Sequence, residues 1–188
     1  AWTIQSSGNF DFLEIFSGRA RASMACADIG LHVGQPIDPI TGFDLLTPEG
    51  RTKAWNIIEA QMPTHIFLAP ACTPWSVMQN LNDADAVKSA QKKAKPMLEF
   101  VKDVCIFQLN NGRFFAVENP RTSRMWYQPD LATVLDQENA IWNNLDMCMH
   151  GLKDPVSKLP YKKGMTIMHN YPRGVLSPIF LVCNHGPE

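Results

Sequence analysis

The chain has 188 residues, a hydrophobic fraction of 45% and a formal net charge of −1. The length suits a single domain over residues 1–188, and the hydrophobic fraction excludes wholesale disorder. The charge excludes a uniformly basic nucleic-acid binder, so a protein that binds DNA or RNA would concentrate positive charge on one face.

The cellular setting is predicted from two further features. No run of residues is long and apolar enough to span a bilayer and no secretory signal opens the chain, so we expect no membrane association. The five cysteines are odd in number and form no tight framework, which favours reduced thiols in an intracellular protein. The chain begins at Ala1 rather than Met, so we expect a processed chain or an excised piece.

The first part of the chain predicts alternating strands and helices. Thr47 and Pro48 mark a helix start, because threonine caps helices and proline suits the first turn. Gly18 indicates the end of the strand before it, and Gly30 indicates the end of a helix. The expected strands are 10–16, 31–37 and 65–69, and the expected helices are 20–29 and 48–60.

A long helix follows, which Asp83 would cap and which would end near residue 111. Pro96 lies inside it and should kink or divide it. One apolar face is expected at helical spacing: Ala90, Ala94, Met97, Val101, Val104 and Cys105. A strand at 113–117, a helix at 129–138 and strands at 145–149, 165–168 and 179–182 complete the expected elements.

Alternation of strand and helix through residue 139 is typical of a parallel sheet with helices on both faces. The last part of the chain reads as strands with little helix, which indicates an antiparallel C-terminal edge. We therefore predict an α/β fold with three layers, α/β/α.

Three predicted loops, at 16–18, 70–76 and 118–120, leave the carboxyl ends of strands, where open α/β sheets hold their ligands. The segment 16–18 (FSG) allows close backbone approach to a ligand, or is only a turn. The segment 70–76 (PACTPWS) presents Cys72 on a loop stiffened by two prolines. That geometry suits a nucleophile, and the alternative is a structural cysteine beside a turn.

Three carboxylate side chains each have a functional and a structural interpretation. Asp38 can accept hydrogen bonds from ribose hydroxyls, or is a turn residue before Pro39. Asp44 can bind an adenine amino group, or caps a turn. Glu118 follows an apolar strand, so it is either a partly desolvated general acid or a solvated carboxylate at a strand end.

Together these segments resemble the cytosine-C5 DNA methyltransferases, which belong to the class I S-adenosylmethionine-dependent enzymes with a Rossmann-like fold. Residues 11–18 (DFLEIFSG) are similar to the family's opening strand and glycine loop. Residues 70–76 are similar to its cysteine loop, and residues 118–120 (ENP) to its Glu-Asn-Val motif. The order and rough spacing agree over about residues 10–130.

The resemblance implies a mechanism and a set of site residues. The Cys72 thiolate would add to C6 of cytosine, Glu118 would hydrogen-bond or protonate N3, and Asn119 would orient the site. C5 would then take the methyl group of S-adenosylmethionine, and loss of its proton would expel Cys72. The implied cofactor residues are Phe16, Ser17, Gly18, Asp38, Asp44 and Pro70, and the substrate residues are Ser76, Arg121 and Arg124. No metal takes part.

DNA is the expected substrate, with RNA as the nearest rival, and a base in a duplex would have to leave the stack. The family's paired arginines are absent, and we interpret Lys162 and Lys163 in that region as an exposed turn. The chain is too short for a separate target-recognition domain. Either a partner subunit or missing domain supplies specificity, or specificity is low.

Two basic groups have open interpretations. Arg121, Arg124 and Trp126 can hold a phosphate and stack on a base, or form a salt-bridged loop with the tryptophan packed inward, which we favour slightly. A lysine cluster early in the long helix is either a solvated face or a phosphate contact. Its members are Lys88, Lys92, Lys93 and Lys95.

A zinc site is a separate hypothesis, because Cys148-x-His150 and Cys183-x-His185 together offer two thiolates and two imidazoles. Two other functions remain open as alternatives to methyl transfer. The first is a non-catalytic module with the same fold that regulates a partner. The second is a thiol-dependent enzyme that acts on a small molecule.

Overall fold

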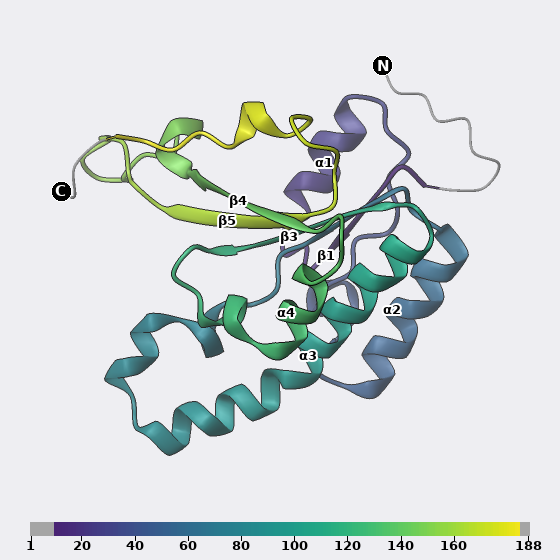
Figure 1. Cartoon of the computed structure of the whole chain (residues 1–188), viewed down its shortest axis with the longest axis horizontal. Helices are drawn as coiled ribbons and strands as arrows, with labels where there is room; N and C mark the ends of the chain where they lie inside the picture. The colour runs from purple at the N-terminus through teal and green to yellow at the C-terminus, as the bar shows by residue number, and fades with distance from the viewer. Residues whose placement is uncertain (1–9, 185–188) are drawn as a thin grey trace.

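A computed structural model describes residues 10–184 of the chain, and Figure 1 shows a mixed α/β arrangement around one twisted sheet. Within this range no helix has both the length and the apolar character needed to cross a membrane. The strands are β1 (Phe12–Ile15), β2 (His65–Leu68), β3 (Phe114–Pro120), β4 (Ile141–Asp146) and β5 (Gly164–His169). The helices are α1 (Arg21–Asp28), α2 (Pro48–Gln61), α3 (Ala84–Asn110) and α4 (Pro129–Leu135).

The sheet has the order β1-β2-β3-β5-β4. β1, β2 and β3 are parallel, whereas β5 is antiparallel to both β3 and β4. The predicted α/β class and the antiparallel end of the sheet are therefore confirmed. β5 lies between β3 and β4, so the antiparallel strand is inside this end of the sheet rather than at its margin.

The helix starts follow from local side-chain chemistry. The Thr47 hydroxyl accepts a hydrogen bond from the Gly50 N–H at 3.0 Å, which confirms its predicted capping role. The Asp83 carboxylate accepts hydrogen bonds from the N–H groups of Asp85 and Ala86, each at 3.0 Å. Both caps satisfy N–H groups that have no partner inside the helix.

The long helix forms as predicted, and of the kink or division expected at Pro96, the division does not occur. α3 runs without interruption from residue 84 to residue 110 with Pro96 inside it. A proline removes the hydrogen bond to the carbonyl four residues earlier, which here belongs to Lys92. Lys92 is exposed, so water can satisfy that carbonyl. The predicted apolar face is buried from Ala94 to Cys105.

The predicted strand at 31–37 is reduced to two isolated parallel bridges, Val33 to Phe12 and Ile37 to Ile15. Pro36 has no N–H for a ladder, which shortens any strand through this segment. The segment still lies beside β1 and extends the parallel part of the sheet by one position.

A further correction concerns residues 118–120, which were expected to be a loop. They are the last residues of β3 and pair with Ile167, Thr166 and Met165 of β5. The antiparallel partner extends the strand beyond the point at which the apolar run ends. Two further boundaries differ: β4 begins at residue 141, and 179–182 forms no strand, because residues 177–179 are a 3₁₀ turn.

The two faces of the sheet are covered differently (Figure 1). The helices α2, α3 and α4 lie on one face and enclose the main core with fully buried Ile66, Leu68, Phe115 and Val117. On the other face lie α1 and the irregular segment 171–183, which packs Tyr171 and Phe180 on a small cluster. The predicted third layer is therefore helical only over part of the sheet.

Candidate functional site

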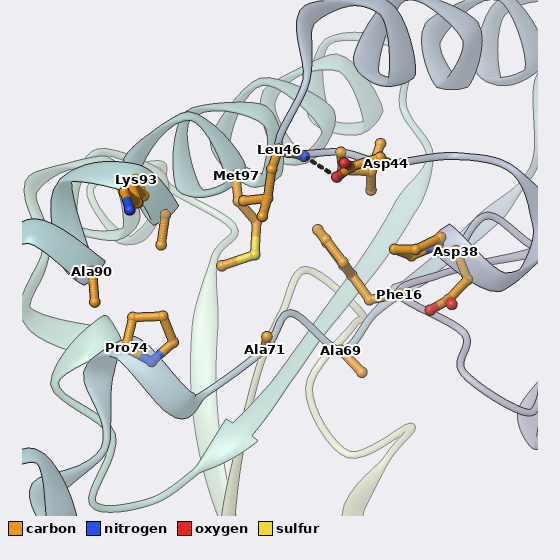
Figure 2. A pocket seen from close by; sticks show the side chains of 13 residues that line it. Phe16, Asp38, Asp44, Leu46, Ala69, Ala71, Pro74, Ala90, Lys93 and Met97 are labelled. Carbon is orange, nitrogen blue, oxygen red and sulfur yellow. Dashed lines mark hydrogen bonds between the residues drawn. The ribbon is translucent and has the colours of Figure 1, made fainter.

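A cavity of about 570 Å³ opens where β1 and β2 end, between the following loops and the side of α3. Figure 2 shows side chains from these loops converging on it from several directions. Its volume suits a small organic ligand. Most of its lining is apolar, with three charged side chains among it. The lining residues are Phe16, Asp38, Pro39, Asp44, Leu45, Leu46, Ala69, Ala71, Pro74, Ala90, Lys93, Ala94 and Met97.

The loop after β1 has an unusual backbone. Phe16 has φ +60° and Gly18 has φ +51°, both in the left-handed region. A non-glycine residue in that region costs about 1–3 kcal/mol, and such residues cluster at functional sites. The Phe16 ring points into the cavity (Figure 2). The hydroxyl of Ser17 is buried and has no hydrogen-bond partner among the described residues.

Asp38 has the predicted turn-capping role and also holds the glycine loop after β1. Its Oδ1 accepts a hydrogen bond from the Ile40 N–H at 3.0 Å and so caps a turn, while Oδ2 accepts one from the Gly18 N–H at 2.9 Å. A carboxylate has about four acceptor positions, so two remain for a ligand. Asp44 likewise accepts from the Leu46 N–H at 3.0 Å and also lines the cavity.

The loop that carries Cys72 is held by its neighbours on both sides. Asn119 is 1% exposed, and its Nδ2 donates to the Pro70 carbonyl at 2.8 Å. From α3, Gln91 Nε2 donates to the Pro74 carbonyl at 3.2 Å. Cys72 lies between the cavity-lining residues Ala71 and Pro74 and is half-buried. The loop is thus held on both sides, and Cys72 is not fully buried within it.

The next part of this loop is a 3₁₀ turn over Val77–Leu81 that Ser76 caps. The Ser76 hydroxyl accepts a hydrogen bond from the Met78 N–H at 3.2 Å. Trp75 is buried beneath the loop. Ser76 therefore has a structural partner at the position where the resemblance implies a substrate contact.

Glu118 and Asn119 are consecutive in β3, so their side chains point to opposite faces of the sheet. Asn119 binds the cysteine loop, whereas Glu118 lies where the Lys163 charge acts on it. Burial raises the pKa of Glu118, and the charge of Lys163 opposes part of that rise. A raised pKa suits a carboxyl group that donates a proton.

The expected turn at Lys163 therefore brings a cation to Glu118 rather than only into solvent. Sequence reasoning missed this, because the two residues meet only through the pairing of β3 with β5. The cavity itself is lined by neither Cys72 nor Glu118.

The arginines after β3 have protein partners. Arg121 Nη2 donates to the buried Asp146 carboxylate at 2.9 Å and to the Leu145 carbonyl at 3.1 Å. Trp126 is 3% exposed and donates to the Pro120 carbonyl. These contacts match the salt-bridged alternative. Arg124 is exposed and donates to Asn80, next to the cysteine loop.

The described members of the two Cys-x-His pairs, Cys148, His150 and Cys183, lie at the outer end of the sheet. The Cys148 and Cys183 thiols are in hydrogen-bond contact, and the Cys183 N–H donates to Asp146 Oδ2 at 2.9 Å. His150 Nε2 lies 2.9 Å from the Ile179 carbonyl oxygen. His185 lies outside the described residues, and within residues 10–184 no three potential ligands gather around a metal position.

The structure thus gathers Phe16, Asp38 and Asp44 in one cavity, with Ser17, Gly18 and Pro70 in the same loops. The wall from α3 was missed as a binding surface, because alanines and a methionine at helical spacing read as core. A scan against protein-family models finds no match to this chain. A search of curated proteins likewise finds no match.

Proposed function

We propose that the chain transfers a methyl group from S-adenosylmethionine to C5 of cytosine in DNA, through a covalent adduct at Cys72. The observation that carries the proposal is the hydrogen bond from Asn119 Nδ2 to the Pro70 carbonyl. It joins the cysteine loop to the Glu-Asn motif, two segments about fifty positions apart in the chain. Beside this junction lies the cavity that holds Asp38 and Asp44.

The sheet supports the finer fold assignment. Parallel strands with an antiparallel strand near the C-terminal end are the arrangement that the resemblance to class I methyltransferases implies. Two candidate loops follow the carboxyl ends of β1 and β2, and residues 118–120 are the carboxyl end of β3 itself, so all three segments lie where open α/β sheets bind ligands. We therefore include the Rossmann-like methyltransferase fold in the proposal.

The cavity residues fit S-adenosylmethionine by their chemistry. Asp38 keeps acceptor positions for ribose hydroxyls, and the unpartnered hydroxyl of Ser17 offers a further polar contact. The Phe16 ring and the aliphatic side chains of Leu45 and Met97 offer apolar surface for a base. When bound, S-adenosylmethionine supplies an electrophilic methyl group.

Cys72 and Glu118 would make C5 of the target base reactive. The Cys72 thiolate forms a bond to C6, which moves the ring electrons toward C5 and N3. The carboxyl group of Glu118 donates a hydrogen bond or a proton to N3 and neutralises the charge that develops there. After C5 is methylated and loses its proton to a base, the C6–S bond breaks and the thiolate leaves.

Covalent trapping tests this proposal. A DNA duplex that contains 5-fluorocytosine cannot lose a proton from C5, so the enzyme should remain attached through Cys72. We expect a denaturation-resistant adduct with the wild-type chain and with Cys26→Ser, a matched half-buried cysteine on α1. Cys72→Ser should give no adduct and at least about a 10³-fold loss of methyl transfer.

A tritium-methyl assay on DNA beside tRNA separates the two nucleic-acid substrates. Preferential labelling of tRNA would replace DNA by RNA in the proposal. Full methyl transfer by Cys72→Ser would refute the covalent route.

A regulatory module that binds S-adenosylmethionine without catalysis is the second candidate. It is favoured by two observations: Cys72 and Glu118 do not line the cavity, and Arg121 is occupied by Asp146. Cofactor binding measured by calorimetry, together with no trapping on any cytosine substrate, would establish that candidate. A partner subunit would then supply the catalytic or recognition surface.

A further inference from the structure

The first half of α3 extends away from the sheet, at the lower left of Figure 1, next to the turn that follows the cysteine loop. Lys88, Lys92 and Lys95 are exposed on it and recur at i, i+4 and i+7. Residues at that spacing share one side of a helix, so the three form a lysine stripe.

The same turns of α3 form a wall of the cavity. Ala90, Ala94 and Met97 line it, and Lys93 lines it from the edge next to the lysine stripe. Figure 2 shows Lys93 at one end of the cavity, beside Ala90 and Pro74, with Asp38 at the other end. The cavity therefore has a basic end on the side of the cysteine loop and an acidic end on the side of β1.

The helix and the cysteine loop are held together. The hydrogen bond from Gln91 Nε2 to the Pro74 carbonyl joins α3 to the loop two residues after Cys72. A ligand that contacts Lys93 is consequently close to the loop that presents the thiol. Because α3 is continuous through this region, the stripe has a fixed direction relative to that loop.

Few carboxylates compete for these lysines. Asp85 pairs with Lys88 at 3.8 Å, and both side chains are largely exposed, so this pair is weak. None of the ion pairs within residues 10–184 involves Lys92, Lys93 or Lys95. Their charges are available to an outside anion. The whole chain has a net charge of only −1, so this side of α3 is a local concentration of positive charge.

We propose that Lys93 and the lysine stripe hold consecutive phosphates of the target nucleic-acid strand, so that the strand reaches Cys72 across the first half of α3. This inference rests on the proposed function. The stripe spans about 10 Å at 1.5 Å per residue, a length over which one strand of a duplex carries about three phosphates. The lysine stripe would thus bind the phosphate backbone of the strand through side chains of this domain.

Binding to a labelled 14-base-pair DNA duplex with one cytosine tests the inference without any need for catalysis. Lys93→Gln should weaken binding about 3- to 10-fold at 0.1 M salt and reduce the slope of log K against log salt by about 0.9. Substitution of Lys88, Lys92 and Lys95 together should remove most of the remaining salt dependence. An RNA strand of the same sequence, measured in parallel, identifies which nucleic acid supplies the phosphates.

Lys102→Gln is the matched control, because it removes one positive charge farther along the same helix, where Lys102 already pairs with Asp103. We expect it to leave both affinity and slope unchanged. An equal loss in Lys93→Gln and Lys102→Gln would overturn the inference, as would an affinity indifferent to all four lysines.

S-adenosylmethionine binding, measured by calorimetry on the same variants, separates this inference from the proposed function. Duplex binding through the lysines by a chain that takes up no S-adenosylmethionine would overturn the proposed function alone. If the chain binds S-adenosylmethionine but the lysine substitutions leave its affinity for the duplex unchanged, this inference alone would be overturned.

Discussion

The two ends of the parallel strands differ in how their side chains are used. At the amino end, the rings of His65, Phe114 and Tyr171 stack with centroid distances of 5.0–5.5 Å and interplanar angles of 7–14°. His65 Nδ1 lies 3.0 Å from the Tyr171 hydroxyl. At the carboxyl end there is a cavity. The backbone of Phe16 beside it is in the left-handed region, and the buried hydroxyl of Ser17 has no hydrogen-bond partner among the described residues.

Each end also has an asparagine that binds backbone. Asn170 at the amino end accepts from the Phe115 N–H and donates to the Arg113 carbonyl, so both ends of its amide are used. Asn119 at the carboxyl end donates to the Pro70 carbonyl, and its buried Oδ1 has no partner among the described residues. Buried oxygens without a partner among the described residues occur at both ends, because Gln108 Oε1 at the amino end is another, but only those at the carboxyl end lie in segments beside this cavity.

The largest expected effect is on catalysis, at Glu118. Glu118→Gln removes the proton that the carboxyl group donates, so methyl transfer should fall about 10²- to 10⁴-fold.

The same substitution should also change stability. Because burial raises the pKa of Glu118, ionisation of its carboxyl group opposes folding at pH values above the ordinary glutamate range. At pH 7 the variant should be more stable by about 0.5–2 kcal/mol, measured by urea unfolding. Glu59→Gln, an exposed carboxylate on α2, is the control; equal effects of both variants would contradict the assignment.

The two asparagines give the next largest effect and the sharpest comparison. Asn119→Ala releases the cysteine loop, so we expect about a 10- to 100-fold loss of methyl transfer. Asn170→Ala breaks two hydrogen bonds at the amino end, so it should reduce the free energy of unfolding by about 1–3 kcal/mol and leave the specific activity unchanged. Denaturation and single-turnover assays on both variants measure this. Equal losses of activity would remove the distinction between the two ends.

Ser17→Ala is expected to separate binding from stability. Its hydroxyl is buried without a partner, so removal should leave stability unchanged or raise it slightly. If the hydroxyl contacts S-adenosylmethionine, affinity should fall about 3- to 10-fold. Ser23→Ala is the contrast, because the buried Ser23 hydroxyl donates to Glu14 at 2.7 Å, and its loss should destabilise the fold. A destabilised Ser17→Ala would contradict this reading of the carboxyl end.

The smallest effect concerns pH and the amino end. Burial lowers the pKa of His65, with partial opposition from Asp11, and burial also lowers the pKa of His169. Protonation therefore opposes folding, and stability is lost as the pH falls below the ordinary histidine pKa of about 6.5. We expect a loss of about 1 kcal/mol between pH 7.5 and pH 5. His65→Gln should reduce this loss, and an unchanged pH dependence in urea unfolding would exclude His65 as its source.

Local chemistry in the sequence determined much of the molecule. The threonine-proline start of α2, the Asp83 cap of α3 and the apolar face of that helix were all predictable, because capping and helical periodicity act over a few residues. The alternation of strands and helices also predicted the parallel part of the sheet. The cavity residues Phe16, Asp38 and Asp44 were predictable because parallel strands bring their following loops to one edge.

The tertiary structure decided whatever depends on partners far away in the chain. The extension of β3 through Glu118 and Asn119 required the antiparallel strand β5, and the proximity of Lys163 to Glu118 required the same pairing. The pairing of Arg121 with Asp146 and the wall that α3 contributes to the cavity are likewise long-range contacts. Sequence patterns report which side chains can pack or bond, but strand order and register determine which ones meet.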